Sequence, residues 1–100
     1  MAHFLVTSGH GPAWDDSKTR RTQPGFDEHA EYMDGLVDRG FVLLGGPVGD
    51  DLDAGDALLL VTATDEAEVR SILATDPWFE TVLTLSSVQR WTLWLKALEL

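Results

Sequence analysis

The chain has 100 residues, which is enough for one domain with one hydrophobic core and too few for two. Its composition, 44% hydrophobic and 24% charged, is that of a globular protein, and its formal charge of −10 argues against nucleic acids and anionic membranes as partners. The absence of cysteine excludes disulfides, thiolate nucleophiles and cysteine-bound metals, and no apolar run approaches the ~18 residues of a membrane-spanning helix. We therefore expect a single soluble domain over residues 1–100, with a cytoplasmic location.

The first half of the chain predicts a strand, a long polar loop and a helix. Phe4–Thr7 is a short β-rich run that ends at glycine and proline, and a polar loop over residues 9–23 follows it. Residues 24–39 are predicted to be helical, because Pro24 suits the first turn and Gly40 supplies a stop. The apolar residues of this segment recur on one helical face at Phe26, Ala30, Met33 and Val37.

The second half predicts two strands, a helix and a closing strand. The strands are expected at residues 41–45, at 57–61 and within 82–98, with an aspartate-rich hairpin loop over 49–56. A helix begins near Asp65, since Asp65 and Glu68 have the spacing of a capping box, and it ends before Asp76. Alternating side chains from Trp91 to Lys96 extend the closing strand.

This order of elements, β-α-β-β-α-β, predicts an α+β fold of the ferredoxin-like (split β-α-β) type. Such a fold has a four-stranded antiparallel sheet with two helices on one face, so its other face needs a cover. On that second face we place six apolar residues of the first and last strands: Phe4, Val6, Leu85, Val88, Trp91 and Trp94. Because a large exposed apolar patch usually marks an interface, we expect a homodimer formed by sheet-to-sheet packing.

Motifs for nucleotides and metals are missing from the sequence. No glycine-rich phosphate loop is present, and His3, His10 and His29 lack the spacing of a metal site. The aspartates of residues 50–56 lack the ligand pattern of a calcium loop. We therefore expect no cofactor and no metal ion.

The candidate chemistry centres on His29 and Asp76. His29 lies at the border of the apolar face of the first helix, where it is either a hydrogen-bonded core histidine or a general base. Asp76 precedes Pro77, so it either caps a short turn or accepts the imidazole N–H and makes the histidine more basic. The spacing of the two residues leaves these alternatives open.

Three segments, His29–Met33, Leu43–Pro47 and Ala74–Phe79, resemble the YciI-like (YCII-related) family in order and spacing, and the likeness covers about residues 26–95. The resemblance implies a dimeric α/β-barrel of ferredoxin-like subunits with an active-site pair of histidine and aspartate. Carried over, that pair is His29 and Asp76. One type of member is similar to a dehydrochlorinase that removes HCl from a chlorinated hydroxyhydroquinone without a cofactor.

The resulting hypothesis is a cofactor-free lyase or isomerase, dehydrochlorinase-like, that acts on a small cyclic or aromatic molecule, with His29 as base and Asp76 as its partner. The expected substrate-binding residues are Trp14, Arg20, Arg21, Tyr32, Gly46, Pro47 and Trp78. The polar loop that carries Trp14 and the two arginines is longer than in the family; Arg20 or Arg21 either holds an anionic or phenolate group or is simply solvated. The alternative is a non-catalytic dimeric module that binds a small ligand or regulates, and a third option is an oxidative enzyme of the same superfamily, with or without haem.

Overall fold

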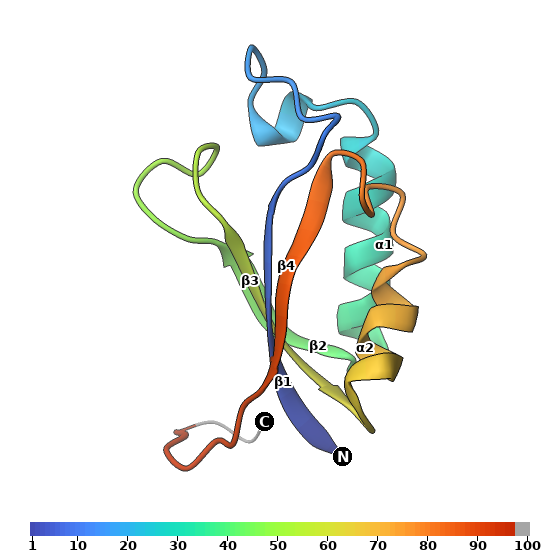
Figure 1. Cartoon of the computed structure of the whole chain (residues 1–100), viewed down its shortest axis with the longest axis vertical. Coiled ribbons are helices and arrows are strands. Elements are labelled where there is room, and N and C mark those ends of the chain that lie inside the picture. The colour runs from blue at the N-terminus through green and yellow to red at the C-terminus, as the bar shows by residue number, and fades with distance from the viewer. Residues whose placement is uncertain (98–100) are drawn as a thin grey trace.

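The structure of the protein is a computed structural model that describes residues 1–97. Its elements in chain order are β1 (Ala2–His10), the 3-10 turn η1 (Arg20–Thr22), α1 (Phe26–Asp38), β2 (Val42–Pro47), β3 (Ala57–Ala63), α2 (Glu66–Leu73) and β4 (Leu83–Arg90). The strands form one antiparallel sheet in the order β2-β3-β1-β4, and both helices cover the same face of it (Figure 1). This confirms the predicted ferredoxin-like fold. No helix within residues 1–97 is long and apolar enough to cross a membrane.

The hydrophobic core lies between the sheet and the two helices. Phe4 and Val6 of β1 are 5% and 1% exposed and belong to one buried cluster with Leu36 of α1 and Val69 of α2. Successive residues of a strand point to opposite faces, so Leu5, between Phe4 and Val6, faces away from the helices.

The predicted assignment of strand faces is wrong. Phe4 and Val6 lie on the helix-covered face, and so do Val88, which pairs with Val6, and Leu85, which packs against the same cluster. The open face, which the helices do not cover, instead carries four leucines, Leu5, Leu44, Leu58 and Leu60, of which Leu60 is itself buried at 3% exposure. Both faces of these strands are apolar, so period-2 alternation identifies two sets of residues without saying which set the helices cover.

The closing strand is shorter than predicted. β4 ends at Arg90, residues 91–96 have no regular secondary structure, and Leu98 lies outside the described residues. The last contact of this ladder is the hydrogen bond from the Trp91 amide to the His3 carbonyl, at 2.9 Å. β1 begins at Ala2, so β4 has almost no partner strand left beyond that point.

The helix boundaries follow local capping. α2 begins as predicted, because the Asp65 carboxylate accepts the Glu68 amide at 2.9 Å. α1 begins at Phe26, two residues later than predicted, since Gly25 adopts a left-handed conformation with φ of 81° and interrupts the chain after Pro24. Pro24 is therefore outside the helix, and its carbonyl is free to accept a bond from elsewhere.

The polar loop predicted over residues 9–23 is shorter and better held than its composition indicates. Strand β1 already includes residues 9 and 10, and the loop contains the turn η1. Gln23, only 2% exposed, accepts the Asp15 amide through Oε1 at 2.9 Å and donates from Nε2 to the Asp15 carbonyl at 2.7 Å. This loop and the hairpin loop that joins β2 to β3 lie at the same end of the sheet (Figure 1).

Candidate active site

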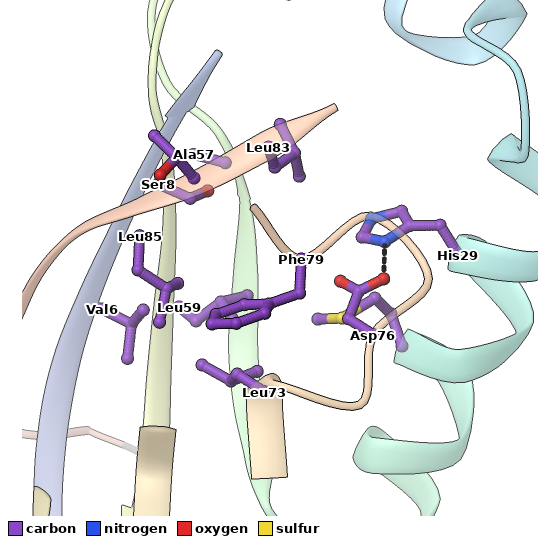
Figure 2. Close-up of a pocket in the computed structure, with 12 residues that line it drawn as sticks. Val6, Ser8, His29, Ala57, Leu59, Leu73, Asp76, Phe79, Leu83 and Leu85 are labelled. Carbon is purple, nitrogen blue, oxygen red and sulfur yellow. Dashed lines mark hydrogen bonds and ion pairs between the residues drawn. The ribbon is translucent and has the colours of Figure 1, made fainter. Parts of the chain in front are cut away.

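His29 and Asp76 meet at the boundary between the helices and the sheet. His29 lies in the first turns of α1, and Asp76 lies in the turn that follows α2, 47 positions further along the chain. Figure 2 shows the imidazole Nδ1 of His29 facing the carboxylate Oδ1 of Asp76, at 2.8 Å. Their side chains are 15% and 11% exposed, so little water surrounds the bond.

Asp76 has two functions at once. Its Oδ1 accepts the Trp78 amide at 2.9 Å as well as the His29 ring nitrogen. The first bond closes the turn after α2, as expected of a capping aspartate, and the second places the carboxylate against the imidazole. The structure therefore shows both contacts that the sequence left open, the turn contact and the contact with the imidazole.

The His29 ring keeps one nitrogen available. A carboxylate at Nδ1 favours the neutral tautomer that carries its proton there, which leaves the lone pair on Nε2. Among residues 1–97, no group hydrogen-bonds to this Nε2, and the atom is not buried. His29 thus combines an anchored donor with an accessible acceptor.

A small apolar cavity adjoins the pair. It measures about 60 Å³ and is bounded by His29, Asp76 and the inner face of the sheet (Figure 2). Val6, Leu73 and Phe79 form its apolar wall. Ser8 contributes a hydroxyl to its lining.

A wider cleft of about 490 Å³ lies between α1 and the edge strand β2. His29 borders this cleft too, so the imidazole joins the two cavities. Gly46, Pro47 and Arg20 also line it, and these three predicted substrate-binding residues therefore share a cavity with His29. The backbone of β2 passes close to β3 beside the cleft, because a Cβ on Gly45 would lie 2.5 Å from Leu59 Cδ2.

Arg20 also has a structural role. Its Nε donates to the Leu52 carbonyl at 3.0 Å, and its guanidinium donates to the Gly55 carbonyl at 3.2 Å. Its backbone amide donates to the Asp53 carboxylate at 2.8 Å. Burial lowers the pKa of the guanidinium, and the charge of Asp53 opposes that change. The side chain thus ties the loop before α1 to the hairpin loop after β2.

The other predicted substrate-binding residues lie outside the two cavities that His29 borders. Trp14 stacks on His10, with ring centroids 3.7 Å apart, beside a separate polar cavity of about 390 Å³. Arg21 is exposed and lies over the Phe26 ring, 5.8 Å from its centroid. The Tyr32 hydroxyl bonds to the Ile72 carbonyl and to Thr75, and so joins the two helices.

Trp78, the last of this set, lies behind the imidazole. Its ring stacks on that of His29 with centroids 4.2 Å apart and planes at 10°, and the residue is 2% exposed. It therefore contacts the histidine rather than either cavity.

Sequence reasoning missed the residues of the sheet that face the pair. Ser8 follows Phe4 and Val6 at the same two-residue spacing, which would have placed it on the same face. Phe79 follows the Asp76-Pro77 turn, and the sequence analysis assigned it no place in the site. Within the described residues, no group of three or more His, Asp or Glu side chains comes together that could hold a metal ion.

The fold and this geometry define an α+β protein with a histidine–aspartate pair at an apolar cavity. A solved structure with the same fold is the 5-chloro-2-hydroxyhydroquinone dehydrochlorinase from Burkholderia phenoliruptrix AC1100, in complex with 2,5-dihydroxybenzoquinone. The likeness has a TM-score of 0.59 at 24% sequence identity and covers 90% of this chain and 93% of that one, which shows a shared fold. No family model and no curated protein matches the chain, so the resemblance to the YciI-like family stays a prediction.

Proposed function

We propose that the protein is a dehydrochlorinase-like lyase that acts on a small hydroxylated ring, with His29 as the general base. One observation carries this proposal: His29 is held through Nδ1 by Asp76, while its Nε2 is accessible beside an apolar cavity. A base of this kind contributes about 10²–10⁴-fold to the rate of a proton transfer. The shared fold with a dehydrochlorinase supports the choice of reaction.

The loss of HCl from 5-chloro-2-hydroxyhydroquinone needs only proton movements and a leaving chloride. His29 Nε2 takes a proton from one ring hydroxyl and returns it to the carbon that bears chlorine, which leaves a ketone and a CHCl centre. It then removes a second hydroxyl proton while the C–Cl electron pair leaves with chloride, and the ring becomes a hydroxybenzoquinone. Asp76 holds the Nδ1 proton throughout and stabilises the imidazolium that forms at each step.

The wider cleft supplies binding groups for this reaction. Gly46 and Pro47 line the cleft where a planar ring would bind, and Arg20 offers positive charge for a phenolate. The apolar wall of the inner cavity keeps water from the reacting atoms.

The test measures chloride release and quinone absorbance from 5-chloro-2-hydroxyhydroquinone. We expect His29→Ala to lower kcat at least ~10²-fold, because the base is lost. His10→Ala is the matched control, since His10 stacks on Trp14 and bonds to the Asp53 carbonyl outside the site. Equal turnover by the wild type and His29→Ala would refute the proposal.

The alternative, a non-catalytic ligand-binding module, has one observation in its favour, the bond from the Trp78 amide to Asp76. In that case Asp76→Asn lowers the melting temperature, and no variant at His29 changes turnover of any screened ring compound. Loss of chloride release at an unchanged melting temperature would exclude this alternative.

We further propose that two copies pack through the open faces of their sheets. The residues on that face are His3, Leu5, Thr7, Gly9, Leu44, Gly46, Leu58, Leu60, Thr62, Thr84, Ser87 and Gln89. None of them is Asp, Glu, Lys or Arg, although 24% of the chain is charged. A face that carries leucines and no formally charged side chain is typical of an interface.

The oligomeric state tests the second proposal. Leu44 of the open face and Val37 of α1 are matched at 50% and 51% exposure. We expect Leu44→Asp to produce monomers in light scattering and Val37→Asp to leave dimers. A monomeric wild type at micromolar concentration would refute it.

A further inference from the structure

Trp78 contacts the candidate base and its surroundings through its ring, its backbone amide and its indole nitrogen. It stacks on the His29 ring at 4.2 Å, its backbone amide donates to Asp76 Oδ1 at 2.9 Å, and its Nε1 donates to the Pro24 carbonyl at 2.8 Å. We propose that Trp78 is a positioning residue that fixes the plane of the His29 ring. This inference rests on the proposed function of His29 as a base.

A single hydrogen bond does not fix an imidazole plane. The torsion between Cβ and the ring of histidine is broad, so the Nδ1–Asp76 bond alone permits the ring to swing about that contact. A buried indole parallel to the imidazole, with an interplanar angle of 10°, removes that freedom. With both contacts in place, Nε2 keeps one direction relative to the cavity.

The stack also favours the charged state that the base passes through. A cation over an aromatic face is attracted by the ring quadrupole, and tryptophan is the strongest partner. The imidazolium of His29 therefore has the Asp76 carboxylate at its edge and the Trp78 indole on its face. The other charged residues that line the wider cleft with His29 are Asp34 and Arg20.

The indole is itself fixed by the end of the loop before α1. Its Nε1 bond reaches the Pro24 carbonyl, and the next residue, Gly25, approaches the same nitrogen so closely that a Cβ would lie 3.2 Å from it. Gly25 also has a positive φ of 81°, which side chains rarely adopt. Loop, indole, imidazole and carboxylate thus form one continuous chain of contacts.

A second histidine–tryptophan stack in the same protein serves as an internal comparison. His10 and Trp14 stack at 3.7 Å with an interplanar angle of 7°. However, His10 uses its Nε2 on the Asp53 carbonyl and has no carboxylate partner among residues 1–97. The combination with a carboxylate and an accessible nitrogen sets His29 apart.

The test follows the tautomer of His29 by ¹⁵N NMR in the wild type, Trp78→Phe and Trp78→Met. Phenylalanine retains an aromatic face, whereas methionine retains bulk without a ring. We expect the Nδ1–H form to dominate in the wild type and in Trp78→Phe, and a mixture of both tautomers in Trp78→Met. Trp14→Leu is the control, and it should change the resonances of His10 and leave those of His29 unchanged.

Kinetics with 5-chloro-2-hydroxyhydroquinone supply the second measurement. Misplacement of the base by Trp78→Met should lower kcat about 10–100-fold and change KM less than about threefold, because the indole touches the histidine and not the substrate. Trp78→Phe should recover most of this loss.

Two results would overturn the inference. One is a folded Trp78→Met protein with the wild-type tautomer and kcat. The other is a wild-type His29 that populates both tautomers, a result that needs no variant to fold. If the tautomer responds as expected while His29→Ala leaves chloride release unchanged, the positioning holds and the proposed function fails.

Discussion

The substitution Gly45→Ala tests whether close packing of the edge strand limits the protein's stability. A Cβ at Gly45 would lie 2.5 Å from Leu59 Cδ2 and 2.8 Å from the Leu58 carbonyl oxygen. The leucine methyl can rotate away, but the carbonyl belongs to the backbone of β3 and can move only with the sheet. The neighbouring Gly46 is a matched control, because a Cβ there would meet no atom within 4 Å.

The expected magnitude follows from these contacts. Overpacking of this kind costs about 1–3 kcal/mol, which corresponds to a fall in Tm of about 5–20 °C for a domain of this size. Gly46→Ala should leave Tm unchanged or raise it slightly, since alanine restricts the unfolded chain by about 0.4–1 kcal/mol. The difference between the two variants therefore isolates the contact with β3.

Thermal and urea unfolding, followed by circular dichroism at one fixed protein concentration, measure this difference. The fixed concentration matters because self-association would make Tm depend on it. If Gly45→Ala and Gly46→Ala unfold at the same temperature and urea concentration, the strand has room at Gly45 and the reasoning from close approach is refuted.

Three further changes test the loop before α1 and the start of α2. Gln23→Leu removes two hydrogen bonds to Asp15 and should cost about 2–3 kcal/mol, with faster hydrogen exchange of the Asp15 amide; unchanged exchange would contradict it. Asp65→Ala removes the cap on the Glu68 amide and should lower stability to urea by about 1 kcal/mol, whereas Asp65→Asn should retain most of it. The hydrogen bond from the Ser17 hydroxyl is the largest influence that lowers the pKa of Asp15. Ser17→Ala should therefore raise that pKa toward its ordinary value in an NMR titration. Because the pKa of Asp15 is lowered in the folded state, this contact stabilises the protein at pH values above the ordinary pKa of an aspartate. The contribution is lost as the pH falls through the lowered pKa.

Local signals predicted the fold well. The helical periodicity of α1, the Asp65 cap and the order of elements each depend on residues close together in the sequence, and these gave the correct plan. The predicted stripe of α1 was wrong in one residue, because Leu36 is the buried core residue at 1% exposure and Val37 is 51% exposed. The end of β4 depends on a residue far away in the sequence, because β4 can pair only as far as the first residues of β1. Alternation from Trp91 onward carries no information about that point, so the strand was predicted too long.

The candidate site needed more than local signals. His29 and Asp76 belong to different helix–turn units, and only the packing of α1 against the end of α2 brings them to 2.8 Å. The sequence indicated both residues as candidates but could not show that their side chains are in contact. Trp78 was predicted to contact substrate, but its burial and its stack on His29 place it behind the imidazole.

The strand order β2-β3-β1-β4 alternates between the two halves of the chain. A chain divided in the hairpin loop between β2 and β3 gives one fragment with His29 and another with Asp76. Neither fragment keeps two strands that are neighbours in the sheet, because each pair it retains is separated by a strand of the other. Only interleaved fragments restore both the ladder and the histidine–aspartate pair. Chloride release from mixed fragments would then report reassembly directly, and the protein becomes a natural candidate for fragment complementation.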